Sequence, residues 1–72
     1  MMSSPHVQVV INGKPTQLPA HGSLLDLLAR FDLDPGAVVV EHNRTIVRRP
    51  KLAGTTVHDG DQVELVHFVG GG

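Results

Sequence analysis

The sequence lacks several residue types, and each absence removes a class of function. Its 72 residues contain no cysteine, tryptophan or tyrosine, and phenylalanine occurs only twice. Without cysteine the chain cannot form a disulfide, offer a thiolate to a metal or carry a persulfide itself. The formal net charge is −1 with 18% charged residues, which is not the basic excess of a nucleic-acid-binding domain. We therefore expect no nucleic acid partner.

Long hydrophobic segments are also missing from the sequence. No stretch approaches the roughly 20 apolar residues of a membrane helix, and residues 1–5 lack the pattern of a signal peptide. A chain of this length forms one small domain, which buries only about 60% of the surface of its unfolded state. We expect a single cytoplasmic domain that does not contact the membrane.

The sequence ends in three glycines, Gly70, Gly71 and Gly72, directly after the apolar residues 63–69. Glycine has no Cβ, so such a tail can enter a channel that is too narrow for other side chains. Three extended residues span roughly 10 Å, enough to bring the Gly72 carboxylate into another protein's active site. A frayed terminus is the alternative, although a terminal Gly-Gly arises by chance in only about one chain in 200. We expect a domain over residues 1–69, flexible over 1–6, and a flexible functional tail over 70–72.

Alternating apolar residues predict strands on both sides of a central helix. Residues 7–11 alternate at period two, and Asn12-Gly13 is typical of a two-residue hairpin turn into a second strand over residues 14–18. Pro15 cannot donate to a ladder, so this second strand is expected at an edge of the sheet. Further extended segments are predicted over residues 37–41, 45–47 and 62–69.

One amphipathic helix is predicted between these strands. Ser23 is a favourable N-cap and Asp26 suits the positive end of the helix, while Asp34-Pro35 ends it. The apolar stripe of this helix is expected to comprise Leu24, Leu27, Leu28 and Phe31. The strand residues expected to pack against it are Val7, Val9, Ile11, Val38, Val40, Val63 and Leu65. By strand alternation Val66 and Phe68 then point to the opposite face, where an exposed aromatic residue beside the tail is a candidate anchor for a partner.

This order of elements predicts an α+β fold of the ubiquitin-like β-grasp type, with a mixed four- to five-stranded sheet packed on one main helix. Over residues 7–72 the chain resembles the thiamine-biosynthesis sulfur carrier proteins of the ThiS family. The residues that carry the resemblance are Asn12-Gly13, residues 24–28, Val40-Glu41-His42-Asn43, Ile46-Val47 and, as the most specific stretch, Asp59-Gly60-Asp61 with residues 63–72.

The resemblance implies that the Gly72 carboxylate is the reacting group and that no side chain of the chain is catalytic. An adenylating partner of the ubiquitin-activating (E1-like) type would use ATP and Mg²⁺ to form an acyl-adenylate at Gly72. A persulfide derived from a cysteine desulfurase would then displace AMP, and the resulting thiocarboxylate would supply sulfur to thiazole synthase. Gly70 and Gly71 would form the thin stem of the tail, and the chain itself would bind no cofactor.

Other interpretations remain open on the sequence alone. A sibling pathway, such as that of the molybdopterin synthase small subunit, tRNA thiolation or a ubiquitin-like modifier, would use the same tail. A plain β-grasp interaction module would not need an exposed C-terminus.

Two groups of polar residues also carry alternatives. Arg48, Arg49 and Lys51 form a short basic cluster, either a solvated loop or a contact for an acidic partner surface or a phosphate. No metal site is expected, because the histidines show no i,i+4 pair and have no cysteine partners. These histidines are His6, His21, His42, His58 and His67.

Overall fold

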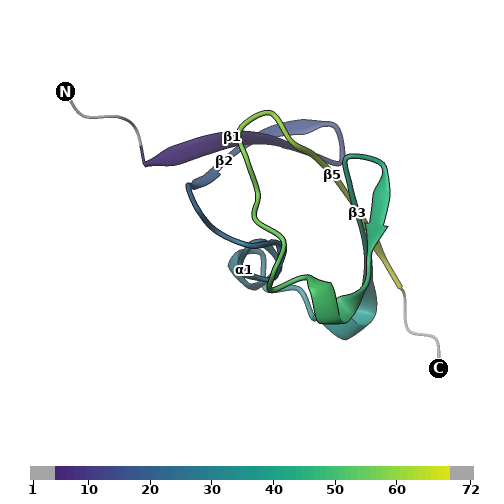
Figure 1. The fold of residues 1–72 in the computed structure, drawn as a ribbon. Coiled ribbons are helices and arrows are strands. Elements are labelled where there is room, and N and C mark those ends of the chain that lie inside the picture. Colours follow the sequence, from purple (N-terminus) through teal and green to yellow (C-terminus); the bar gives the residue numbers. More distant parts are fainter. Residues whose placement is uncertain (1–4, 69–72) are drawn as a thin grey trace.

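The structure, a computed structural model, describes residues 5–68 and contains five strands, one α-helix and two 3₁₀ turns (Figure 1). In chain order the elements are β1 (His6–Ile11), β2 (Lys14–Pro19), α1 (Leu24–Arg30), η1 (Pro35–Ala37), β3 (Val38–His42), β4 (Thr45–Val47), η2 (Arg49–Lys51) and β5 (Gln62–His67). No helix within residues 5–68 has the length and hydrophobicity needed to cross a bilayer. The predicted α+β class and the predicted order of elements are confirmed.

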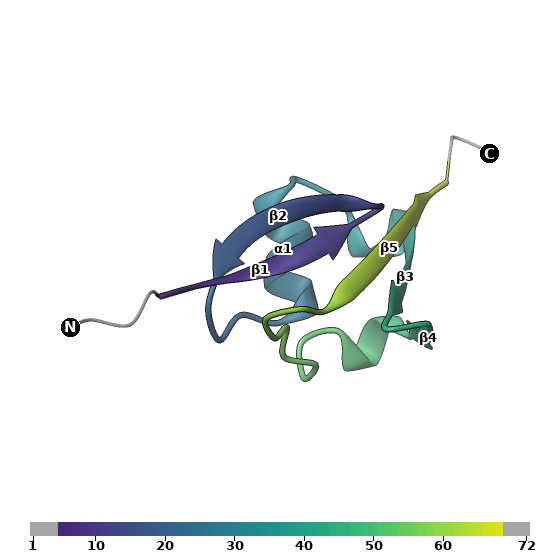
Figure 2. The same cartoon turned by 90° about the horizontal axis from the view of Figure 1, so that it is seen from above.

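The strands form one mixed sheet in the order β2-β1-β5-β3-β4. Strands β1 and β5 run parallel, whereas the β1–β2, β3–β4 and β3–β5 pairs are antiparallel. The last strand therefore lies in the centre of the sheet, with α1 behind the strands when the sheet is seen from above (Figure 2). Because the single helix covers one face, the opposite face of β3, β4 and β5 carries exposed side chains.

The first hairpin forms as predicted. Ile11 pairs with Lys14, so Asn12-Gly13 is a two-residue turn, and both residues have positive φ, +49° and +81°. Positive φ at both central positions defines the turn whose twist matches that of the flanking strands. Pro15 lies on β2, at the edge of the sheet, where its missing N–H group breaks no ladder.

A capping box starts the helix at the predicted N-cap. The Ser23 hydroxyl accepts a hydrogen bond from the Asp26 N–H (3.1 Å), and the Asp26 carboxylate accepts one from the Ser23 N–H (2.9 Å). Two donors that the first helical turn leaves unpaired are thereby satisfied.

The end of the helix differs from the prediction. Helix α1 stops at Arg30, and Phe31 is its C-cap with 43% of its surface exposed. The prediction that Phe31 belongs to the buried stripe is therefore wrong, because the helical periodicity ends one residue before it. Leu33 takes that place in the packing. It is half-buried against the core, and its N–H group donates to the Leu28 carbonyl at 2.9 Å.

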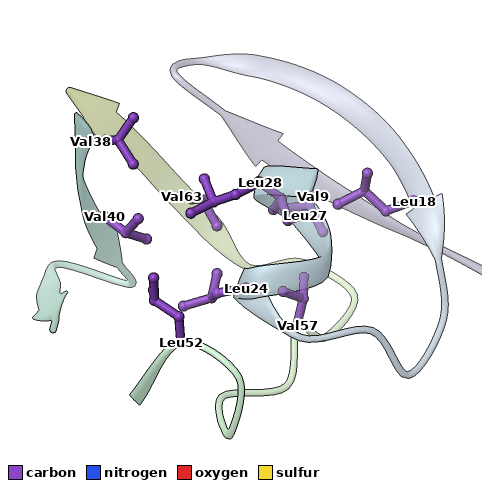
Figure 3. Packing of buried hydrophobic residues seen from close by; sticks show 10 residues of the cluster. All are labelled: Val9, Leu18, Leu24, Leu27, Leu28, Val38, Val40, Leu52, Val57 and Val63. Atoms are coloured by element: carbon purple, nitrogen blue, oxygen red, sulfur yellow. The ribbon is translucent and has the colours of Figure 1, made fainter. Parts of the chain in front are cut away.

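The core lies between α1 and the inner face of the sheet (Figure 3). Its buried members are Val9, Leu18, Leu24, Leu27, Leu28, Val38, Val40, Leu52, Val57 and Val63. Three further strand residues named by the sequence pattern, Val7, Ile11 and Leu65, are half-buried against this cluster, so the predicted inner face of the strands is confirmed. The pattern missed Leu52 and Val57, which lie in an irregular connection where no periodicity marks a buried position.

Candidate functional site

The tail continues from a strand that is held on both sides. Strand β5 pairs with β1 and β3, and the last register pair joins Val38 to His67. One residue further, the Phe68 N–H group donates to the Ala37 carbonyl at 2.9 Å. Gly70, Gly71 and Gly72 lie outside the described residues, so their roles as stem and reacting terminus stay predictions.

Val66 and Phe68, the two residues predicted to face away from the helix, are exposed. They retain 58% and 57% of their accessible surface, respectively. Their exposure is confirmed, and Val66 lines a hollow of the outer face with Glu41, Ile46 and Glu64. The position of Phe68 on this face and a partner-binding role for either residue stay predictions. Both residues lie within four positions of Gly70 in the sequence.

Apolar residues from the neighbouring strands extend this surface. Val39 of β3 pairs with Val66, and Ile46 of β4, which is 61% exposed, pairs with Glu41. Sequence reasoning missed Val39 and Ile46 as site residues. Alternation on β3 could have found Val39, because it falls between the buried Val38 and Val40. We refer to Val39, Ile46, Val66 and Phe68 as the outer apolar patch.

The end of this face away from the tail is charged. Glu41 and Glu64 are direct partners in the β3–β5 register, an arrangement in which like charges repel. Arg44 of the β3–β4 turn lines the same shallow hollow as these two carboxylates. On β3 and β5 the outer face therefore changes from Glu41 and Glu64 to Val39 and Val66 towards the tail, while Ile46 of β4 lies beside Glu41.

Asn12 reinforces β5 on the side of the first hairpin. Its side-chain oxygen accepts from the Leu65 N–H (2.7 Å), and its side-chain N–H donates to the Leu65 carbonyl (3.3 Å). The Asn12 side chain thus makes the two hydrogen bonds to the Leu65 backbone that a neighbouring strand would make beyond the end of β1. The sequence marked Asn12 as a turn residue and gave no sign of this second role.

A buried carboxylate fixes the start of β5. Asp61 is only 9% exposed, and it accepts hydrogen bonds from His42 Nε2 (2.7 Å), the His58 backbone N–H (2.8 Å) and Asn43 Nδ2 (3.1 Å). Burial raises the pKa of the Asp61 carboxyl. The hydrogen bonds from His42, His58 and Asn43 outweigh that effect, so the pKa lies below its usual value. This network joins the β3–β4 turn to β5, which is a structural role.

A mixed sheet in this strand order, folded around one helix, places the protein in the ubiquitin-like β-grasp class. The chain is similar to the crystal structure of a thiamine biosynthesis protein (ThiS) from Geobacter metallireducens. The two share 33% identity with a TM-score of 0.79, and the match covers 92% of this chain and 100% of that one.

The ThiS family model matches residues 6–72. The chain is also 38% identical over 63 residues to the sulfur carrier protein ThiS of Bacillus subtilis (strain 168), covering 86% of this chain and 96% of that protein. The chain belongs to the ThiS family.

A second kind of relative is much longer. The chain is 35% identical over 66 residues to a thiazole synthase of Magnetococcus marinus. That match covers 92% of this chain but only 20% of the relative, so the chain spans about a fifth of its length.

Proposed function

We propose that this protein is a sulfur carrier of thiamine biosynthesis, whose C-terminal glycine transports sulfur as a thiocarboxylate. The observation that carries the proposal is the similarity to a sulfur carrier protein over 96% of that protein's length. The three glycines at positions 70–72, separated by two residues from the end of the central strand β5, also support it. The small chain acts as a protein cosubstrate, and its partners supply the catalytic groups.

The chemistry takes place at the Gly72 carboxylate. An E1-like adenylating enzyme joins this carboxylate to the AMP part of ATP with Mg²⁺ as counterion, and pyrophosphate leaves. The terminal sulfur of a persulfide, formed by a donor such as a cysteine desulfurase, then attacks the activated carbonyl carbon and AMP leaves. A second thiol of the donor system cleaves the S–S bond, which releases the thiocarboxylate and leaves a disulfide on that system. The absence of cysteine from the carrier agrees with this division of labour.

Thiazole synthase is the proposed acceptor. A segment similar to nearly the whole of this chain forms about a fifth of the M. marinus protein of that name. Covalent linkage of a carrier to its acceptor raises their effective concentration. The fusion therefore supports a direct encounter between this chain and a separate thiazole synthase.

The outer apolar patch is the proposed docking surface. Val66 and Phe68 are the members nearest to the tail in sequence, Val39 pairs with Val66, and Ile46 lies further back, in the row of Glu41 and Glu64. Exposed apolar residues that gather on one face of a small protein mark an interaction site. A partner bound there keeps the domain outside while the glycines enter its active site. A cytoplasmic location stays a prediction.

Complementation separates this proposal from the sibling pathways. The chain should restore growth without thiamine to a bacterium that lacks its own thiamine sulfur carrier. It should not restore molybdenum-cofactor synthesis to a strain that lacks the small subunit of molybdopterin synthase. Rescue of the second strain alone would assign the protein to the sibling pathway.

A further inference from the structure

Most of the positive charge in this protein lies in one short segment. Four of the six Lys and Arg residues fall within residues 44–51, which contain no acidic residue. One of the four, Arg44, lines the same hollow as Glu41 and Glu64. The other three, Arg48, Arg49 and Lys51, lie at η2, and we call them the η2 basic surface.

The backbone of this surface is anchored in the core. Leu52, which follows it directly, is 2% exposed, and its carbonyl accepts from the Leu25 N–H at 3.3 Å. Within the turn, the Lys51 N–H donates to the Arg48 carbonyl at 2.8 Å, and the Lys51 carbonyl accepts from the Thr55 hydroxyl at 2.7 Å. Pro50 restricts the turn further. The three cations therefore project from a backbone of fixed shape, so a partner orders only their side chains.

The cations of the surface form no direct ion pair within the described domain. All three side chains are exposed. Across residues 5–68, no carboxylate forms an ion pair with any of them. Asp34, a carboxylate close to this surface, is the N-cap of η1 and accepts a hydrogen bond from the Gly36 N–H at 2.9 Å. A Cβ placed on Gly36 would be 3.4 Å from Asp34 Oδ1 and 3.2 Å from Arg49 Nη1, so this carboxylate offsets part of the charge. The surface still carries three cations against one nearby carboxylate, on a protein whose net charge is −1.

The guanidinium group of Arg49 lies close to the point where the tail leaves the sheet. A Cβ placed on Gly36 would be 3.2 Å from Arg49 Nη1, so the guanidinium group lies beside this glycine. The next residue, Ala37, accepts the hydrogen bond from the Phe68 N–H. The cation is therefore close to the last described residue before the tail and to the outer apolar patch.

We propose that the η2 basic surface binds an acidic rim on thiazole synthase, beside the opening that receives the glycine tail. This inference rests on the proposed function, since it names a contact made by the same docking event. Opposite charges at the rim of an interface accelerate association and fix its orientation, which suits a carrier that must dock, deliver and leave. Three cations on a slightly acidic protein could contact only a few phosphates of a nucleic acid. An acidic protein surface is therefore favoured over a nucleic acid as the partner.

Charge reversal at a matched pair of arginines tests the proposal. Arg49→Glu and Arg30→Glu change the net charge equally, but Arg30 ends α1 and lines a hollow with Leu18 and Pro19 of the opposite edge strand. Association of each full-length variant with the thiazole synthase of the same organism is measured by stopped flow, from about 20 mM to about 500 mM salt. Arg48→Glu provides a second variant of the same surface. Thermal unfolding checks that each variant folds.

If the η2 basic surface contacts an acidic rim of thiazole synthase, Arg49→Glu and Arg48→Glu should slow association by about tenfold at low salt. The difference should shrink at high salt, where the Debye length falls to a few ångströms. Arg30→Glu should associate at a rate within about twofold of the wild type.

Equal association rates for Arg49→Glu and Arg30→Glu at low salt would overturn the inference. Salt-sensitive binding of an RNA duplex that Arg49→Glu and Arg48→Glu abolish would also overturn it. If the wild type neither binds thiazole synthase nor acquires sulfur at Gly72, the proposed function itself falls. If it does both and the variants match the control, only this inference falls.

Discussion

Replacing Leu28 with alanine tests the packing of α1 on the sheet that positions the tail. Leu28 is 1% exposed in the core, and truncation of a buried leucine costs about 2–5 kcal/mol. A domain of 72 residues has a total unfolding free energy of about 4–11 kcal/mol at 0.05–0.15 kcal/mol per residue. The substitution should therefore remove a large part of the stability and leave a marginally folded protein.

Leu25 provides the matched control for this experiment. It lies on the same helix and is 38% exposed, so Leu25→Ala makes the same chemical change without opening a cavity and should cost less than about 1 kcal/mol. In urea titrations the Leu28→Ala midpoint should fall by at least about 2 M, given a slope of about 1 kcal/mol/M. Equal losses for the two variants would refute the assignment of Leu28 to the core and Leu25 to the surface.

Two further predictions concern the buried carboxylate and the outer apolar patch. The pKa of Asp61 lies below its ordinary value of 3.8, so its ionised form stabilises the protein above that value and the stability is lost as pH falls through the folded-state pKa. In denaturation measured across pH, Asp61→Asn should therefore destabilise the protein most at neutral pH and progressively less below about pH 4. Phe68→Ala should leave the fold intact and weaken binding to the adenylating enzyme or thiazole synthase by about tenfold. Phe31 is the partly exposed phenylalanine at the end of α1, and Phe31→Ala should not weaken this binding. If calorimetry shows that Phe68→Ala leaves the affinity for both partners unchanged, Phe68 is not part of the interface.

Local signals in the sequence account for much of this fold. Asn12-Gly13 specifies a two-residue turn, Ser23 with Asp26 specifies the start of the helix, and alternation in β1 specifies which face is buried; all three are confirmed. Phe31 was mispredicted because helical spacing alone does not show where a helix ends. Leu52 was missed because its burial depends on segments that are distant in sequence.

Local sequence signals predicted less of the candidate site than of the fold, because the site depends more on contacts between segments that are distant in sequence. Strand alternation alone placed Val66 and Phe68 on the uncovered face, and their exposure is confirmed. The addition of Ile46 to the same face depends on the pairing of β4 with β3, and the position of Arg49 beside Gly36 depends on how two separate turns pack. Such long-range neighbours leave no periodic signal in the sequence.

The central claim is that the Gly72 carboxylate acquires sulfur, and mass spectrometry tests it most directly. After incubation with the cognate adenylating enzyme, MgATP and a sulfur donor, intact-mass and C-terminal peptide spectra should show one oxygen replaced by sulfur at Gly72. Deletion of Gly72 leaves a glycine carboxylate but shortens the reach by roughly 3.5 Å, and Gly71→Val widens the stem and restricts its backbone. Both variants should fold and lose the exchange, because reaction geometry is sensitive to displacements of about 1 Å. An unmodified wild type, or full exchange in both variants, would contradict the account.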